Sequence, residues 1–452
     1  MPNSPVPPGS ADPRHWERWA VGLVLACFVA VSIHAVGNAA TAGQDHIEHY
    51  KYTRQILDHP GTWLVENSTC RPLLYWIGAL CILLVGDPRG FQLASILFAL
   101  GGAAALALLH DASRRAIHSP LVRTTGIAFL AFLPLTVVTT VVYAGDTVAS
   151  LPFVLAGWCL VRCLESDSDG KALFHASLAG AALAAGAFAR ATFVVLPAAV
   201  VLVLLALWRA GRLTPRRGWT VFLLVALLPG IIGGWLADKA ARQFADAKPV
   251  NHFVWRGAGE LAFLVKPSDG RILDAPGFFD GRAGFILPNN YSYPALLHLS
   301  IFTDFLDFTQ NAHRQIPRPA PQSTYSRWSV RLGLVFSLGA FAAVAAFWVR
   351  TLAGIARPRG MPTTATLTWS ALAMVWYAPF IATLPFVTNV NIWGYWLPRY
   401  VMPSLWIFFL SLFAALDRLP GKWRTPCSSL AAVLVLVLGV TETMAIWYPW
   451  TD

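Results

Sequence analysis

Apolar stretches close to 20 residues in length recur along most of this chain of 452 residues. A helix needs about 20 apolar residues to cross the roughly 30 Å hydrocarbon core of a bilayer. Hydrophobic residues make up 56% of the chain and charged residues 13%, whereas a soluble domain carries about 25% charged residues. The sequence therefore excludes a soluble protein and predicts an all-α polytopic membrane protein.

Eleven segments have the length and hydropathy of a transmembrane helix. They lie at about 19–40, 91–110, 122–143, 147–163, 173–189, 191–208, 219–237, 328–350, 364–384, 399–416 and 428–447. A twelfth apolar segment, 72–86, is only fifteen residues long and follows Arg71. Because a segment of this length is too short to span, we expect a re-entrant or interfacial helix on the outer side.

The basic residues between the spans set the orientation, because cytoplasmic loops carry an excess of Lys and Arg. With eleven spans and a cytoplasmic N-terminus, the inner loops receive Arg114, Arg115, Arg162, Lys171, Arg209, Arg212, Arg216, Arg217, Arg350, Arg357, Arg359, Arg418, Lys422 and Arg424. The outer connections 144–146 and 385–398 carry none. Counting 72–86 as a span would reverse the side of every later loop, so the charges favour eleven spans.

This topology leaves two long segments on the outer side, and both are candidates for chemistry. We expect an N-terminal transmembrane module, 1–237, with a first external loop at 41–90. An external cap, 238–327, and a C-terminal transmembrane module, 328–452, follow.

The N-terminus and the net charge each suggest a second interpretation. Arg14 and Arg18 precede the first apolar run as in a signal peptide. That run is longer than a usual signal core, however, so we expect the first helix to be retained. The formal charge of +11 lies in short clusters between spans, with no basic face interleaved with aromatic residues. Nucleic acid is therefore not an expected partner.

A polar segment directly after the first span is the strongest candidate for a site. Residues 44–57 predict a short helix lying on the outer membrane surface. One side of it carries Asp45, Glu48, His49 and Tyr52 at i, i+3, i+4 and i+7. Two other interpretations stay open: Asp45 caps the helix and the rest form a solvated face, or the carboxylates and imidazoles hold a divalent metal ion. Their order matches no metalloprotease signature.

Three ionisable residues stand at predicted outer ends of spans. Asp146 lies alone between two apolar helices and could serve as an N-cap. Arg190 interrupts a long apolar stretch, and Arg399 opens a late span. Positive charge is unexpected on the outer side, so these arginines either reach headgroup phosphates or bind a phosphorylated ligand.

Four features in this order resemble the GT-C superfamily of membrane glycosyltransferases. Its members include protein O-mannosyltransferases, the aminoarabinose transferases of lipid A and the catalytic subunits of oligosaccharyltransferases. The features are an acid after the first span (Asp45, with Tyr50 five residues later), Pro-Leu-Leu-Tyr-Trp at 72–76, Asp146 at the next outer turn, and Arg-Tyr-x-x-Pro at 399–403. The chain departs from the family in having His46 where many members have a second acid, and Arg71 before Pro72.

The resemblance implies an inverting transferase that takes a sugar from a polyprenyl-phosphate donor on the external, periplasmic face of the bacterial inner membrane. Asp45 would be the general base. Further residues would bind donor or acceptor, a lipid, glycan or protein: Glu48, His49, Tyr50, Arg71, Tyr75, Asp146, Arg190 and Arg399. Glu48, His49 and Asp146 could instead hold a divalent metal ion, as in the oligosaccharyltransferase branch.

Three competing functions remain open. A ligase or polymerase similar to O-antigen ligases would rely on His252, Arg256, His298 and His313 in the external cap. A transporter or flippase would use Asp45 and Asp146 for ion coupling, although such proteins carry charges in the middle of spans. A structural assembly subunit is the third.

Overall fold

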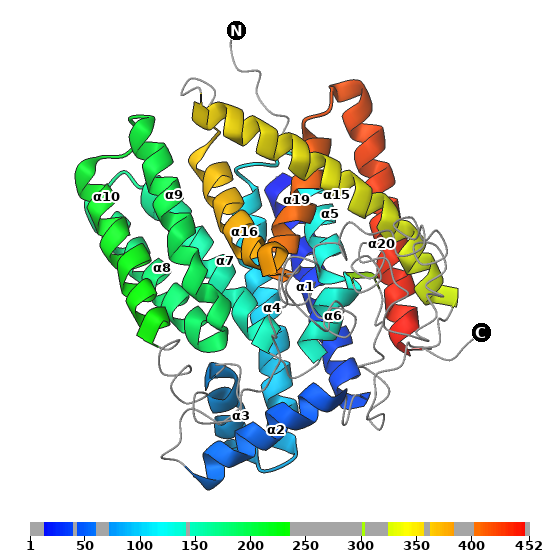
Figure 1. Cartoon of the computed structure of the whole chain (residues 1–452). Helices are drawn as coiled ribbons and strands as arrows, with labels where there is room; N and C mark the ends of the chain where they lie inside the picture. Colours follow the sequence, from blue (N-terminus) through cyan, green and yellow to red (C-terminus); the bar gives the residue numbers. More distant parts are fainter. Residues whose placement is uncertain are drawn as a thin grey trace, which may run out of the picture.

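The computed structural model describes residues 13–38, 43–59, 72–141, 145–235, 301–302, 324–356, 362–383 and 402–447. All secondary structure in these ranges is helical, and the long helices stand side by side as a bundle (Figure 1). The helices of the first half are α1 (Pro13–Asn38), α2 (Gly43–Asp58), α3 (Pro72–Val85), α4 (Arg89–Ser113), α5 (Pro120–Ala131), α6 (Pro134–Val141), α7 (Gly145–Leu164), α8 (Asp169–Ala189), α9 (Leu196–Arg209) and α10 (Pro215–Val221). Those of the second half are α15 (Thr324–Ala356), α16 (Thr364–Thr383), α19 (Met402–Asp417) and α20 (Gly421–Trp447).

Six helical stretches among the described residues are long and apolar enough to cross a membrane. They are His15–Val36, Arg89–Ser113, Asp169–Ala189, Pro215–Trp235, Trp328–Val349 and Gly421–Thr441. Shorter apolar helices occupy four other predicted spans, for example Val148–Leu164 and Met402–Asp417, and α16 occupies the predicted span 364–384. The all-α polytopic fold is confirmed, while the count of eleven spans stays a prediction.

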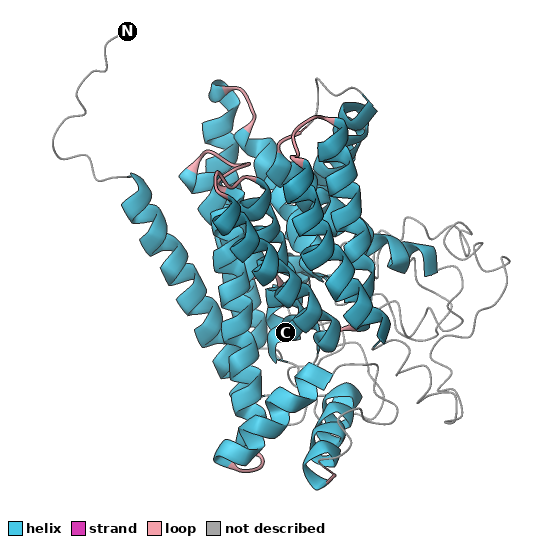
Figure 2. Ribbon diagram, turned by 90° about the vertical axis from the view of Figure 1, so that its left-hand side faces the viewer, coloured by secondary structure: helices cyan, strands magenta, loops and turns pink. Residues whose placement is uncertain are grey.

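The basic loops predicted to share one side do lie together. Arg115 after α4 pairs with Glu165 after α7, with 2.7 Å between Nε and Oε2. Arg212 after α9 donates to the carbonyl oxygen of Pro362, before α16, at 3.0 Å. Figure 2 shows these connections at the end of the bundle where α1 begins. We call this the inner end and the opposite one the outer end.

The predicted span 122–143 is broken into two helices. α5 ends at Ala131 and α6 begins at Pro134. A proline inside a helix lacks the N–H for the i−4 hydrogen bond and clashes with that carbonyl, which favours the break before Pro134. A second irregularity is the π-helical turn η2 (Phe222–Leu227), which continues α10.

The short segment 72–86 forms α3 at the outer end and does not cross the bundle, as predicted. It joins α4 through a tight turn in which Gly86 has φ +80°, a conformation that favours glycine. A Cβ atom on Gly90 would lie 2.4 Å from the backbone of Ile82. The absence of a side chain at Gly90 therefore allows α3 and α4 to pack as a close hairpin. Figure 1 shows α2 and α3 together below the bundle.

The core joins the two halves of the chain. Phe129 of α5 contacts Phe336 of α15 and Phe409 of α19, with ring centroids 4.5 and 4.9 Å apart. Trp376 of α16 packs edge-on against Phe153 of α7. The C-terminal helices therefore pack directly on the N-terminal ones. The division of the chain at residue 328 into two transmembrane modules stays a prediction.

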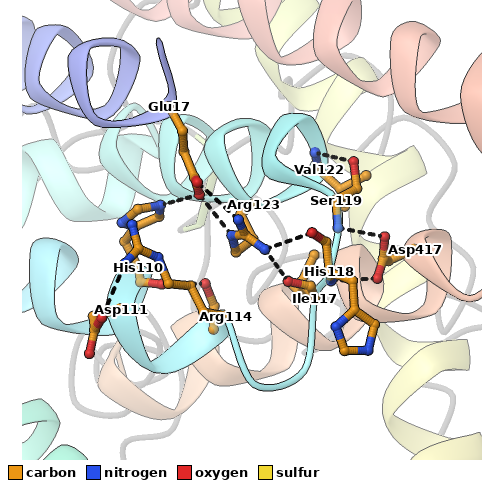
Figure 3. A network of polar contacts seen from close by, with 11 residues as sticks. Glu17, His110, Asp111, Arg114, Ile117, His118, Ser119, Val122, Arg123 and Asp417 are labelled. Carbon is orange, nitrogen blue, oxygen red and sulfur yellow. Dashed lines mark hydrogen bonds and ion pairs between the residues drawn. The ribbon is translucent and has the colours of Figure 1, made fainter. Parts of the chain in front are cut away.

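A buried polar network fixes the inner ends of α1, α4 and α5 (Figure 3). The Glu17 carboxylate, 1% exposed, accepts two hydrogen bonds from Arg123, at 2.8 and 2.9 Å. It also lies 2.8 Å from Nε2 of His110. Arg123 in turn donates to the carbonyl oxygen of His118 at 2.9 Å. Charge-assisted bonds of this kind are among the strongest in proteins, so the network locks the loop 114–119 to three helices.

Candidate active site

Helix α2 forms where the sequence predicts it and lies across the outer end. Its sequence carries charged or hydrogen-bonding side chains along most of the length of the helix. Thr53 donates from its hydroxyl to the carbonyl oxygen of His49 at 2.8 Å. α2 packs against α3, the next helix in the chain. The α2–α3 pair therefore brings together the two short motifs that follow the first span.

His49 and Tyr75 meet in the buried interface between α2 and α3. Nδ1 of His49 lies 3.1 Å from the hydroxyl oxygen of Tyr75. The two side chains are 6% and 1% exposed, so both polar groups have left water. Tyr52 adds an edge-on ring contact to Tyr75 at 5.6 Å. This part of the predicted polar side of α2 is therefore buried against α3, and the interpretation of it as a solvated face is wrong.

A second contact joins α2 to the turn between α3 and α4. The hydroxyl of Tyr50 donates to Oδ2 of Asp87, and Nη1 of Arg54 lies 3.4 Å from the same oxygen. The Tyr50 ring also packs edge-on against Phe91 at the start of α4. The hydrogen bond to Asp87, then burial and the Asp87 charge raise the pKa of Tyr50 above its usual value. Tyr50 thus remains a protonated donor at neutral pH.

Asp87 is a residue that the sequence analysis missed. It lies in the turn Gly86–Arg89, within the predicted external loop 41–90, where it was not singled out. An exposed carboxylate in a turn gives no local signal that it has a partner. Tyr50 and Asp87 are 37 positions apart, and only the packing of α2 on α3 and the turn after it brings them together.

The helix register of α2 places Asp45 relative to these contacts. Asp45 lies four positions, about one helical turn, before His49, and Glu48 directly precedes His49. The side chains of Asp45 and Glu48 fall outside the described residues. Their catalytic and binding roles therefore stay predictions, supported by a backbone whose next turn is anchored on α3.

Arg190 occurs at the outer end of α8, where the helix gives way to the 3-10 turn η1 (Ala191–Val195). It is 6% exposed and takes an extended backbone, with φ −161° and ψ 129°. A Cβ atom on Gly186 would lie 2.0 Å from the Phe193 ring, so the glycine permits the fold-back after Arg190. The long apolar stretch is therefore two helices, and the arginine stands at their junction.

Helix α3 connects this junction to α2. Trp76 contacts Phe188 of α8, with ring centroids 5.7 Å apart. Trp76 follows Tyr75, which reaches His49, so one turn of α3 touches both α2 and α8. The structure thus brings His49, Tyr50 and Tyr75 into direct contact networks and places Arg190 at the adjoining helix end.

For the remaining predicted residues, the structure describes the backbone alone or does not describe the residue. Asp146 is the second residue of α7, at the outer end as predicted, and its side chain is outside the described set. Arg71 and Arg399 also lie outside the described residues, as do the residues assigned to the ligase alternative, namely His252, Arg256, His298 and His313.

A metal site is not formed by the side chains that the structure describes. No group of three His, Cys, Asp or Glu residues in those ranges could hold an ion. Of the three predicted ligands, only His49 has a described side chain, and one of its ring nitrogens already faces Tyr75. A divalent ion held by Glu48, His49 and Asp146 therefore stays a prediction.

Comparison with known proteins adds a family match. Residues 58–232 match the family model described as dolichyl-phosphate-mannose-protein mannosyltransferase. The match starts at the last residue of α2 and includes Tyr75, Asp146 and Arg190, but Asp45 precedes it. Among curated proteins, none matches the sequence.

Among solved structures, the comparison returns that of the Archaeoglobus fulgidus oligosaccharyltransferase in complex with Zn and sulfate. It shares 12% identity with the chain, with a TM-score of 0.49 over 93% of the chain. The chain spans 53% of the length of that protein.

Proposed function

We propose that this chain transfers a sugar from a polyprenyl-phosphate donor to an acceptor at the outer end of the bundle. The family match supports a GT-C superfamily membrane glycosyltransferase. The observation that carries this proposal is the anchoring of α2. His49 and Tyr50 follow Asp45 by about one helical turn. They contact Tyr75 and Asp87, respectively. A general base needs a fixed position relative to the acceptor, and the contacts of His49 and Tyr50 support such a position for Asp45.

In this mechanism the Asp45 carboxylate takes the proton from the acceptor hydroxyl. The hydroxyl oxygen forms a bond to the anomeric carbon as the bond to the phosphate oxygen breaks on the opposite face. The anomeric configuration inverts, and the leaving group departs as polyprenyl phosphate. Base catalysis of this kind contributes about 10² to 10⁴ in rate.

The leaving group gains negative charge in the transition state, and fixed guanidinium groups stabilise that charge. Arg190 is the described candidate, because it is buried at the outer junction of α8 and η1. Arg71 and Arg399 are assigned the same role from the sequence. Glu48 and Asp146 would orient sugar or acceptor hydroxyls.

The location follows from the charges. The inner end carries the basic loops, so the positive-inside rule puts the N-terminus in the cytoplasm and α2 on the external or periplasmic face of the inner membrane. Nucleotide sugars are absent from that face, whereas a polyprenyl-linked donor resides in the bilayer. The acceptor is a lipid, glycan or protein in the same compartment.

The test uses the purified full-length protein in nanodiscs. Radiolabelled sugars are offered as polyprenyl monophosphates, polyprenyl diphosphates or nucleotide sugars, with a membrane fraction as acceptor source. We expect transfer from a monophosphate donor with an inverted anomeric linkage in the product. Transfer from a diphosphate-linked glycan alone would favour the ligase alternative, and retention of configuration would contradict Asp45 as a base.

A further inference from the structure

A cavity of about 290 Å³ lies at the inner end, between α4, α15, α16 and α19. This is the end opposite α2 and α3 (Figure 1). Its wall includes Leu109 of α4, Phe347 of α15, Trp369 of α16 and Leu410 of α19. The volume is at the lower end of the range for small-molecule sites. The proposed transfer reaction makes no use of it.

The three serine hydroxyl groups that line the cavity donate their protons within their own helices. Ser113 donates to the carbonyl oxygen of His110 at 2.7 Å, and Ser370 to that of Thr366 at 2.7 Å. Ser411 donates to the carbonyl oxygen of Ile407 at 2.9 Å. Since these donors are satisfied within their own helices, the interior favours an apolar group such as a hydrocarbon chain.

The buried network of Figure 3 fixes one wall of this cavity. Ala116 and Ile117, in the loop after α4, line it. Arg123 donates to the carbonyl oxygen of Ile117, and Asp417 accepts from the backbone N–H groups of His118 and Ser119, at 2.7 and 3.0 Å. The loop is thus held from both sides, and the cavity is part of a rigid arrangement.

Arg418 is the charged residue among those that line the cavity. We call the edge of the cavity beside Arg418 its mouth. Arg418 is exposed, and neither an ion pair nor a side-chain hydrogen bond joins it to another described residue. The neighbouring acid, Asp417, is engaged with the loop and does not neutralise it. In the sequence, segments 345–356 and 418–428 contain no acidic residue and add Arg350, Lys422 and Arg424. The mouth therefore attracts an anion.

We propose that this cavity binds an anionic phospholipid of the leaflet at the inner end. One acyl chain would occupy the apolar interior, and the phosphate would accept hydrogen bonds from Arg418. The combination of an apolar chamber and a guanidinium at a basic membrane face suits an amphiphile with a negative headgroup. The cavity lies at the opposite end of the bundle from the proposed donor site. Lipid binding there would be separate from the transfer reaction.

Native mass spectrometry of the full-length protein tests this proposal. Delipidated protein is titrated with phosphatidylglycerol, and in a second arm with phosphatidylcholine of the same chains. We expect one phosphatidylglycerol to bind first, and Arg418→Gln to weaken it about tenfold, as the loss of a charge-assisted bond predicts. Lys422→Gln, which removes the same charge from an exposed residue outside the lining, should change the affinity less than twofold.

A second pair of variants tests the chamber itself. Ala346 lines the cavity, whereas its neighbour Ala345 does not, and both are exposed residues of α15. Ala346→Phe should abolish the tight phosphatidylglycerol site, while Ala345→Phe should leave it unchanged. Equal lipid binding by the two phenylalanine variants, or by the Arg418→Gln and Lys422→Gln proteins, would overturn the proposal. So would equal affinity of the wild type for the two lipids.

Discussion

The two ends of the bundle are held together by different forces. At the inner end, Glu17, His110, Arg123 and Asp417 form buried charge-assisted bonds that tie α1, α4, α5 and α19. At the outer end, α2 rests on α3 and the turn after it through ring contacts, the His49–Tyr75 contact, and the more exposed contacts of Tyr50 and Arg54 with Asp87. Removing a buried ionic partner costs far more than removing a neutral hydrogen bond or an exposed ion pair. The inner end is therefore the more strongly held of the two, and α2 is anchored at the outer end by weaker contacts.

The largest expected effect is at the inner end. Arg123→Met should destabilise the protein by about 3–5 kcal/mol, because it leaves the Glu17 carboxylate buried without its main partner. Thermal unfolding in detergent measures this. The exposed pair of Arg216 and Asp169, 2.9 Å apart, provides the control: Arg216→Met should shift the midpoint little. Equal shifts for the two variants would contradict the contrast between a locked inner end and ordinary surface charges.

A smaller effect is expected where α2 meets α3. Tyr75→Phe removes the hydroxyl that faces His49 and should cost about 1 kcal/mol of unfolding free energy. It should also lower sugar transfer, because α2 then loses a contact one turn after Asp45. The matched control is Tyr377→Phe in α16, which removes a tyrosine hydroxyl remote from α2. If Tyr75→Phe and Tyr377→Phe retain the same transfer rate, the contact does not position α2.

The smallest effect concerns Tyr50 and depends on pH. Because Asp87 raises the folded pKa of Tyr50 above the unfolded value of about 10, the bond adds stability at pH values below about 10 and loses it as pH rises through the folded pKa. Tyr50→Phe should therefore lower stability by less than about 1 kcal/mol at pH 7. The difference in melting temperature between wild type and variant should shrink toward pH 11.

A difference that stays constant or grows between pH 7 and pH 11 would mean that the Tyr50 proton is not shared with Asp87. Asp87→Asn serves as the internal control, since it removes the charge that raises the pKa of Tyr50. The pH dependence should then be weaker in Asp87→Asn than in the wild type.

Much of the fold follows from hydropathy and charge. The apolar periods predict most of the long helices. The basic loops argue against counting α3 as a span, because that count would move Arg115 and Arg212 together to the outer side. The short helix carrying Asp45 and the helix end at Arg190 also follow from local sequence. Pro134 could have predicted the break between α5 and α6, since proline is a local signal.

The contacts within the site could not be predicted in this way. His49 and Tyr75 are 26 positions apart and Tyr50 and Asp87 are 37, and the pairing depends on the angle at which α2 lies on α3. The Glu17–Arg123 pair spans 106 positions. A charge inside an apolar segment indicates that a partner exists, but only the packing of three helices identifies it.

The measurement that tests the central claim most directly is the rate of sugar transfer by Asp45→Asn, compared with Asp58→Asn. Both changes remove a carboxylate from α2, and Asp58 is the exposed last residue of that helix. We predict a loss of about 10²- to 10⁴-fold for Asp45→Asn, as expected for removal of a general base, with near wild-type transfer by Asp58→Asn. Wild-type transfer by a folded Asp45→Asn protein would contradict the assignment of α2 as the catalytic helix.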